Sequence, residues 1–351
     1  MDAVAGSSAR ERAQLFEAAE ARQVPRIAAP LIEKDFWVCW ALRRLFEVLQ
    51  FRPHLIFKGG TSLSKVYHAI ERFSEDVDLS LSRGDLGFAD DKDPEQAGIS
   101  NKEARRRLEA LVAQCREVVR DRLVPELRRD FATVLGAAGW SVDLDADDPQ
   151  TVVFTYPPSE LSRGLSYVRP AIRLEMGARS DDWPAADAGI TPYAAEVFPN
   201  LFAVPTSRVR TLLAERTFWE KATLLHAETH RPSDKPARER LSRHYYDLYR
   251  LAQQSAGQRA LEQPELLARV VTHKSFFFAQ SWAHYETARS GTFRLVPPEA
   301  RRAELRRDYL DMEAMIFGEA PAWDDILKGL QQLEDRINDC HRPPTGERGG
   351  A

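Results

Sequence analysis

Residues 57–81 read FKGGTSLSKVYHAIERFSEDVDLSL, and this stretch decides how the fold of the first half of the chain is interpreted. Two glycines separate the apolar run HLIFK from a helical pattern over residues 62–70, and Asp76 and Asp78 then follow with one residue between them. An apolar run that ends at a glycine turn predicts a short buried strand leading into a helix. The expected order is therefore strand, glycine turn, helix and a second strand over residues 76–82.

The second strand carries two carboxylates on one face. Alternate side chains of a strand point to opposite faces, so Asp76 and Asp78 lie on the same side, about 6.5–7 Å apart along the strand. Val77, Leu79 and Leu81 then face a core. Two carboxylates this close repel each other unless a cation lies between them, and Mg2+ prefers oxygen ligands that it shares with phosphate groups. The simpler alternative is a solvated strand face.

The glycine turn predicts a second part of the same site. Gly59 and Gly60 let the backbone approach a ligand closely, and we expect Thr61 or Ser62 to cap the helix that follows. Free N–H groups at a helix start favour an anion such as phosphate. A Gly-Gly turn alone is common, but together with the carboxylates it indicates a site for a nucleoside triphosphate with Mg2+. No Walker A motif and no G-x-G-x-x-G fingerprint is present.

Length and composition are those of a folded globular protein. The chain has 351 residues, 43% hydrophobic and 29% charged, and at about 100–200 residues per domain this predicts two domains or one large bilobed domain. The formal net charge of −4 gives no nucleic-acid signal for the molecule as a whole, although clustered arginines allow a local basic surface.

The cysteines, the N-terminus and the apolar runs indicate the cellular compartment of the protein. Cys39, Cys115 and Cys340 are far apart and form neither a disulfide framework nor a metal-spaced set. The N-terminus lacks the order of a signal peptide, and no apolar run reaches the roughly 20 residues that span a bilayer. We expect a cytoplasmic protein with no membrane partner.

The pattern of elements changes along the chain. Helical patterns occupy residues 8–22, 29–50 and 102–138, the last with a possible break near Pro125, and strand patterns occupy 140–144, 151–156 and 168–176. A segment rich in Pro and Asp, 180–207, separates these from helical patterns at 208–230, 236–254, 264–273, 275–287, 299–317 and 323–340. We expect an α/β (mixed α+β), bilobed fold: a lobe of mixed sheet and helices over 1–190, an α-helical lobe over 191–340, and a disordered tail over 341–351.

Three blocks carry a family resemblance. They are EKDFWVCWALRRLF (33–46), KGGTSLSKVYHAIERFSEDVDLSL (58–81), and RTLLAERTFWEKATLLH (210–226) followed by SRHYYDLYRL (242–251). In this order they resemble the AbiEii/AbiGii (MenT-like) toxin family, which consists of minimal nucleotidyltransferases of the DNA polymerase beta superfamily. The blocks extend from the first lobe into the second, and the segments between them add little.

The resemblance implies an activity. It implies a nucleotidyltransferase toxin of a toxin–antitoxin or abortive-infection system, with a nucleotidyltransferase fold in the first lobe. Such an enzyme transfers nucleotides from a nucleoside triphosphate to an RNA acceptor, here expected to be the 3′ end of tRNA, and so blocks translation. The implied cofactor is Mg2+, with Mn2+ as a substitute, and the implied protein partner is a cognate antitoxin.

The resemblance also assigns residues. Asp76 and Asp78 match metal-binding carboxylates, Thr61 matches the small residue that helps to hold the triphosphate, and Lys221 and Asp247 match a catalytic lysine and aspartate. Lys221 has the alternative of a solvated surface lysine, and Asp247 that of an i,i+4 pair with Arg243. Where many family members have Asp after the arginine of the last block, this chain has His244.

Further candidates depend on position in the sequence. Glu175, on a polar strand face with Arg173, is the candidate for a third metal ligand, with a cross-strand ion pair as the alternative. Residues expected to contact the nucleotide or its phosphates, each with the alternative of a solvated side chain, are Lys58, Lys65, Arg72 and Ser74.

Other functions and partners are also weighed. His226 and His230 stand at i,i+4, but the order H-A-E-T-H and the lack of an evident third ligand give no zinc prediction. Basic residues and tyrosines make 231–246 the preferred RNA-contacting segment. Two other classes remain open: a non-catalytic nucleotide- or RNA-binding module, and a kinase-type phosphotransferase that acts on a protein partner.

Overall fold

The structure is a computed structural model that describes residues 1–49, 51, 54–74, 76–161 and 169–339. The chain divides into two compact units, Met1–Leu213 and a second that begins at Ala214. The tail expected to be disordered, 341–351, lies outside the described residues. Cys39 and Cys115 are buried and free, and Cys340 also lies outside the described part.

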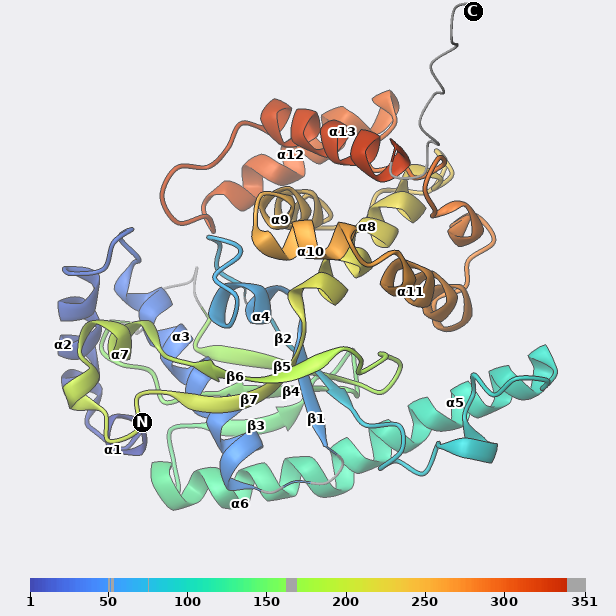
Figure 1. Ribbon diagram of the computed structural model, residues 1–351. Coiled ribbons are helices and arrows are strands. Elements are labelled where there is room, and N and C mark those ends of the chain that lie inside the picture. Colours follow the sequence, from blue (N-terminus) through green and yellow to red (C-terminus); the bar gives the residue numbers. More distant parts are fainter. Residues whose placement is uncertain (50, 52–53, 75, 162–168, 340–351) are drawn as a thin grey trace, which may run out of the picture. The chain divides into compact units, whose positions relative to one another are not determined.

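The first unit is built on a mixed seven-stranded sheet (Figure 1). In the order in which the strands lie side by side, they are β3 (Ser141–Leu144), β4 (Thr151–Thr155), β5 (Ala171–Gly177), β2 (Asp76–Leu81), β1 (Leu55–Lys58), β7 (Ser207–Leu212) and β6 (Ala185–Ile190). β2 runs antiparallel to β1 and parallel to β5, whereas β1 runs parallel to β7. The centre of the sheet therefore joins strands that are far apart in the sequence.

The register separates an apolar face of the sheet from a charged one. Val77 of β2 lies beside Leu174 of β5, which in turn lies beside Val152 of β4, and all three are fully buried. The next residue of β2, Asp78, points to the other face, as alternation along a strand requires. The predicted division of 76–82 into an apolar and an acidic face is thus present in the structure.

Helix α3 (Ala29–Arg43) covers the apolar face. Its Trp37 and Trp40 are fully buried, and their ring centroids lie 6.0 and 5.8 Å from that of Phe154 on β4. The helix continues as a π-turn, Arg44–Val48. The remaining helical segments of the unit are α1 (Asp2–Ala5), α2 (Ala9–Glu20), α4 (Gly59–Lys65), α5 (Asn101–Val118), α6 (Val124–Leu135), α7 (Tyr193–Val197) and short 3-10 turns at Asp90–Lys92 and Pro199–Leu201.

The long helical stretch expected over 102–138 does not break at Pro125. α5 passes through a π-turn, Val119–Leu123, directly into α6 (Figure 1). Pro125 is the second residue of α6 and follows directly on the π-turn. The wider π-turn accommodates the transition without ending the helix.

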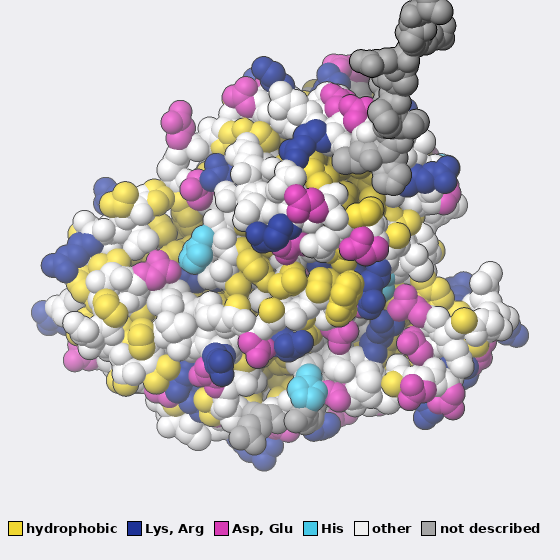
Figure 2. Space-filling view, in the orientation of Figure 1, with side chains coloured by type: hydrophobic (Ala, Val, Ile, Leu, Met, Phe, Trp, Pro, Cys, Tyr) yellow, Lys and Arg dark blue, Asp and Glu magenta, His cyan; other side chains and the backbone are white. Residues whose placement is uncertain are grey.

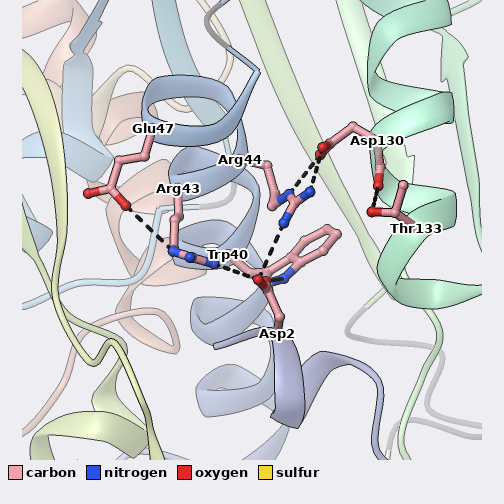
Figure 3. A network of polar contacts seen from close by, with 7 residues as sticks. All are labelled: Asp2, Trp40, Arg43, Arg44, Glu47, Asp130 and Thr133. Atoms are coloured by element: carbon pink, nitrogen blue, oxygen red, sulfur yellow. Dashed lines mark hydrogen bonds and ion pairs between the residues drawn. The ribbon is translucent and has the colours of Figure 1, made fainter.

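A network of ion pairs ties α1 to α3 and α6 (Figure 3). The Asp2 carboxylate accepts a hydrogen bond from the Trp40 indole at 2.9 Å and pairs with Arg43 and Arg44. Arg44 also donates to Asp130 of α6, at 2.7 Å. These partly buried contacts fix α1 against α3 and, through Arg44, join it to α6.

The second unit is helical in its described part. Its helices are α8 (Ala214–Thr229), α9 (Ser242–Ala252), α10 (Ser255–Leu261), α11 (Pro264–Phe277), α12 (Glu299–Glu313), α13 (Trp323–Asp339) and a 3-10 turn, Tyr285–Thr287. α8 packs against α9, α10 and α11. The separate helix expected over 275–287 is wrong, since its first residues belong to α11 and its last residues form the 3-10 turn. None of the helices in the described residues is both long and apolar enough to cross a membrane.

The segment expected to separate the lobes belongs to the first unit. Residues 180–207 contain β6 and α7, and 207–212, most of which was expected to be helical, form the strand β7. β7 pairs with β6 on one side and with β1 on the other, so it completes the sheet. For this reason the division between the units follows Leu213, whereas the sequence placed the boundary at residue 190.

Candidate functional site

The charged face of the sheet brings together four candidate residues. Asp76 and Asp78 are half-buried on one face of β2. In the register, Asp78 lies between Lys58 of β1 and Glu175 of β5, while Asp76 lies beside Arg173. Residues opposite each other on neighbouring strands share a face, so the two aspartates and Glu175 form a carboxylate row on adjacent strands.

The glycine turn closes against this row. Gly59 begins α4 with a φ of +77°, a conformation that side chains with a Cβ rarely adopt. A Cβ on Gly59 would lie 1.9 Å from Oδ2 of Asp78, which no side chain permits. The backbone of the turn therefore packs directly on the Asp78 carboxylate, and this contact requires glycine.

The second glycine packs against two more candidates. A Cβ on Gly60 would lie 2.9 Å from Nη2 of Arg72 and 3.0 Å from Oγ of Ser74. Arg72 is buried and donates to the carbonyl of Phe73 at 3.1 Å. The guanidinium and the hydroxyl thus lie at the turn that precedes the carboxylates, where the sequence expected contacts to a nucleotide.

Thr61 and Ser62 do not cap the helix, so that prediction is wrong. The N-cap position is Lys58, with no side-chain cap. Instead, the Thr61 hydroxyl donates to the carbonyl of Asp76 at 2.5 Å, and the Ser62 hydroxyl donates to the carbonyl of Gly59 at 2.9 Å. The Thr61 hydroxyl ties the glycine turn to β2, and the Ser62 hydroxyl closes the turn on itself. The expected role of Thr61 toward a triphosphate stays a prediction.

Positive charge stands beside Asp76. Arg173 Nε lies 3.8 Å from Oδ1 of Asp76, and Arg173 Nη1 donates to Asp145 at 2.5 Å. Asp145 also accepts from the backbone N–H groups of Asp147 and Asp148. The hydrogen bond from Arg173, aided by these two, lowers the pKa of Asp145, so Asp145 is a fixed anchor for the arginine.

The carboxylate row offers the type of ligand that a divalent cation prefers, although it is not gathered into a three-residue metal site in the described structure. Asp76, Asp78 and Glu175 offer carboxylate oxygens from adjacent strands, and oxygen is the ligand that Mg2+ and Mn2+ prefer. The Asp78 carboxylate is held in place by the Gly59 backbone. In the part of the chain that the structure describes, no group of three or more His, Cys, Asp or Glu residues is arranged as a metal site. The role of Glu175 as a third ligand stays a prediction.

Lys65 lies in the core of the first unit rather than on a phosphate-binding surface. Its ammonium is buried, 2.9 Å from Oδ1 of Asp35, and lies 3.5 Å from the ring centroid of Tyr193. Burial disfavours the charged form, but the Asp35 carboxylate outweighs it and raises the pKa of Lys65. An ammonium fixed in this way holds α4 to α3 and α7, so we leave Lys65 out of the nucleotide site that we propose below.

The first block, EKDFW, has a structural role that sequence reasoning missed. Glu33 is fully buried and accepts from the backbone N–H of Ser159 at 2.6 Å and from its hydroxyl at 2.9 Å. Asp35 accepts from the backbone N–H of Tyr193 at 2.7 Å. The available signal was charge within an apolar helix pattern, because buried charges require partners.

In the second unit, Lys221 and Asp247 form a buried ion pair. Lys221 Nζ on α8 lies 2.7 Å from Oδ2 of Asp247 on α9. The Lys221 side chain is 8% exposed and that of Asp247 is not exposed at all, so Lys221 is not a solvated surface lysine. His244 Nδ1 lies 3.4 Å from the same ammonium. Two of the residues that the family resemblance assigns therefore form an ion pair with each other within this unit.

Other expected contacts in the second unit are replaced by packing. Tyr245 and Tyr246 are each 1% exposed, so the expected stacking of RNA bases on these tyrosines is wrong. They lie on the apolar side of α9. The buried His226 accepts from the backbone N–H of Arg294 through Nδ1, and its Nε2 lies 3.0 Å from the Thr287 hydroxyl. Burial, more than any neighbouring charge, lowers the pKa of His226 to about 4, so it is a neutral part of the core.

Comparison with known proteins identifies the family. A search of curated proteins gives no match. Among solved structures, the nucleotidyltransferase toxin MenT4 from Mycobacterium tuberculosis H37Rv is similar at 15% sequence identity and a TM-score of 0.50, over 93% of this chain and 89% of that chain, which shows a shared fold. The family described as nucleotidyl transferase AbiEii toxin, type IV toxin–antitoxin system, matches residues 40–329, a range that includes every candidate residue named above from Lys58 to Asp247. This protein belongs to the AbiEii family of nucleotidyltransferase toxins.

Proposed function

We propose that this toxin transfers a nucleotide from a nucleoside triphosphate to the 3′ end of tRNA with Mg2+, and that the modified tRNA blocks translation. Family membership makes the chain a nucleotidyltransferase with a triphosphate substrate, a divalent metal and a cognate antitoxin. The observation that carries the proposal is the carboxylate row packed on the backbone of the Gly59 turn. That arrangement puts the proposed metal ligands directly against the glycine turn, where the triphosphate would bind.

The carboxylate row would hold the metal. Asp76 and Asp78 would bind the ion, with Glu175 as a third ligand, and Mg2+ or Mn2+ is the proposed ion. When bound, the ion neutralises phosphate charge and activates the acceptor hydroxyl. Arg173 balances Asp76 before the ion arrives, which limits the repulsion within the row. Lys58 lies beside Asp78 in the register, and its side chain, which forms no ion pair with a described residue, would contact a phosphate.

Lys221 would act on the leaving group. In the transfer, an acceptor hydroxyl oxygen bonds to the α-phosphorus, the bond from that phosphorus to the bridging oxygen breaks, and pyrophosphate leaves. An ammonium stabilises the negative charge that develops on pyrophosphate. Asp247 would be a positioning residue, because its buried carboxylate pairs with the Lys221 ammonium and fixes its direction. The two units thus supply different groups to one proposed reaction.

The RNA acceptor would meet a surface of mixed charge. Figure 2 shows basic and acidic side chains interspersed over the visible face, in agreement with the net charge of −4. With Tyr245 and Tyr246 buried, contacts from 231–246 would come from its basic residues to phosphates, and phosphate contacts position a nucleic acid without reading its sequence. The proposed compartment is the cytoplasm, where tRNA is available.

Incubation with total tRNA tests the proposal. The full-length protein is mixed with total tRNA, Mg2+ and each α-labelled nucleoside triphosphate in turn, and the products are separated on a denaturing gel. We expect label on tRNA, and its removal by nucleases that trim the 3′ end. A chelator should abolish the labelling, and added Mg2+ or Mn2+ should restore it.

The same assay separates the alternative functions. Label from a γ-labelled triphosphate on a protein would indicate a kinase-type activity. Binding of triphosphate without any incorporation would indicate a non-catalytic module. Incorporation into RNAs other than tRNA would keep nucleotidyl transfer but replace the proposed acceptor.

A further inference from the structure

Lys274 is a cation of the second unit to which the reaction above gives no role. It lies on α11, which packs against α8, and its side chain is half-buried. Its Nζ donates to the backbone carbonyl of Glu220 at 2.6 Å. No carboxylate among the described residues forms an ion pair with this ammonium. A half-buried ammonium without a direct ion pair is costly, so its position calls for an explanation.

Three other cations act electrostatically on Lys274. Each has a carboxylate partner within 3.0 Å: Arg216 with Glu220, Lys221 with Asp247, and Arg238 with Glu228. We call Arg216, Lys221, Arg238 and Lys274 the cation group. Glu228 also pairs with Arg231 at 3.4 Å, so positive charge exceeds negative charge around these pairs. Lys274 adds a further positive charge that has no ion-pair partner of its own among the described residues.

We propose that Lys274 binds a phosphate of the nucleoside triphosphate next to the phosphate bound by Lys221, as a second phosphate-binding residue of the second unit. This inference rests on the proposed function, which supplies the triphosphate. The chemistry matches, because adjacent phosphates carry several negative oxygens and suit two ammonium groups close together. The hydrogen bond to Glu220 uses one N–H of Lys274, and an ammonium has three donors.

The charge state of Lys274 offers a specific readout. Burial, followed by Arg216, Lys221 and Arg238, lowers the pKa of Lys274 to about 8, against the opposing effect of Glu220. The other elements that pack on α11 carry the charged or titratable groups Arg259, Tyr285 and Glu286. A bound polyphosphate favours the charged ammonium, so binding should take up a proton above this pKa. The affinity of the protein for polyphosphate should therefore fall as the pH rises through about 8.

The test uses inorganic tripolyphosphate as the probe. Calorimetric titration compares the full-length protein with Lys274→Met, Lys274→Arg and, as a control, Lys328→Met on the exposed side of α13. At neutral pH we expect Lys274→Met to weaken binding about tenfold, as loss of one charged hydrogen bond predicts. Lys328→Met should bind like the natural protein. Lys274→Arg should bind as well as the natural protein and lose the decline above pH 8, because arginine stays charged.

Folding and tRNA binding by Lys274→Met are measured separately from tripolyphosphate binding. Thermal melting should show Lys274→Met folded and, at neutral pH, more stable, because a lowered lysine pKa means that the charge destabilises the folded state. This difference should shrink as the pH rises from about 8 toward the ordinary value of 10.5. A gel shift with tRNA should be unchanged in Lys274→Met.

Specific results would overturn the inference. If Lys274→Met bound tripolyphosphate as tightly as the natural protein, Lys274 would be excluded from the site. If Lys274→Met lost tRNA binding but kept tripolyphosphate binding, Lys274 would be excluded as well. If the tripolyphosphate affinity of Lys274→Arg fell above pH 8 as much as that of the natural protein, Lys274 would also be excluded from the site. The binding assay needs no transfer, so absence of nucleotide incorporation would refute the proposed function without affecting this result.

Discussion

Asp78 is the residue on which the carboxylate row depends, since it has Lys58 on one side, Glu175 on the other and the Gly59 backbone against its carboxylate. Asp78→Asn keeps the shape of the side chain and removes its charge. We expect transfer to fall by about 100-fold or more, the upper end for the loss of a group that supports a metal. Stability without metal should stay the same or rise slightly, since one source of repulsion is gone.

Asp187→Asn is the matched control for this change. Asp187 lies on β6 of the same sheet, with its side chain 65% exposed, and pairs with Arg210 at the surface. Surface pairs contribute little to stability, so this variant should keep both activity and melting temperature. Unchanged transfer rates in Asp78→Asn, at any Mg2+ concentration, would rule out the catalytic assignment.

The Lys65–Asp35 pair gives a prediction of the opposite kind. Lys65→Met leaves a buried carboxylate without its partner, and loss of one partner costs about 3–5 kcal/mol of the free energy of unfolding. The double change Asp35→Leu with Lys65→Met removes both charges and should recover most of that stability. Denaturant unfolding measures both effects.

Triphosphate binding by the double variant then tests the place of Lys65. We expect affinity close to that of the natural protein, because the ammonium serves the packing of α3, α4 and α7. A double variant that folds well and fails to bind tripolyphosphate would return Lys65 to the nucleotide site.

At the scale of elements, the turn between β1 and α4 combines a backbone conformation with a close contact. Gly59→Ala must adopt a positive φ, at about 1–2 kcal/mol, and must also displace the Asp78 carboxylate. Gly87→Ala has the same kind of φ, +85°, and nothing within 4 Å of its added Cβ. We expect similar losses of stability from backbone strain in both variants and loss of transfer in Gly59→Ala alone.

Melting temperature and nucleotide incorporation are the two measurements for this pair. Loss of activity in both variants would attribute the effect to general destabilisation. Full activity in Gly59→Ala would show that the position of Asp78 is not fixed by the turn.

The elements that the sequence predicted well are those with a strong local period. β2 alternates strictly, and α3 is apolar on nearly every side, so both were predicted close to their observed bounds. β7 was missed because RTLLAERTFWEK reads as one helix, although the strand ends at Leu212 and α8 begins at Ala214. The partners that make 207–212 a strand are β6, along its whole length, and β1, about 150 residues earlier, and no pattern within 207–212 contains that information.

The site divides in the same way. The carboxylate row and the glycine turn were predictable, because alternation along β2 and the need for a close backbone approach are local properties. The burial of Lys65 was not, because it depends on Asp35 and Tyr193 from distant segments. The Lys221–Asp247 pair joins two helices, and the sequence indicated each residue without the contact between them.

At the scale of the whole molecule, the proposed reaction draws on both units. Asp78→Asn impairs the first unit, and the double change Lys221→Met with Asp247→Leu removes the buried pair of the second without leaving an isolated charge. We expect each variant to be inactive in transfer. An equimolar mixture should also stay inactive, because each chain would lack one of the required groups.

Incorporation assays on the mixture test this expectation, and size-exclusion chromatography shows whether the copies associate. Recovery of transfer would show that groups from different copies complete one another, against the proposal that a single chain supplies both.

The strand order has a consequence for synthesis of the protein on the ribosome. β1 and β2 are made early, yet each has one edge that stays open until a later strand arrives: β5 for β2 and β7 for β1. Open strand edges and late, non-local pairing expose a growing chain to aggregation. A chain released before residue 175 lacks Glu175 beside Asp78, and one released before residue 207 lacks β7, the strand that pairs with β1. Premature termination should therefore yield aggregation-prone fragments without transferase activity, so that only translation through both units delivers a working toxin to the cell.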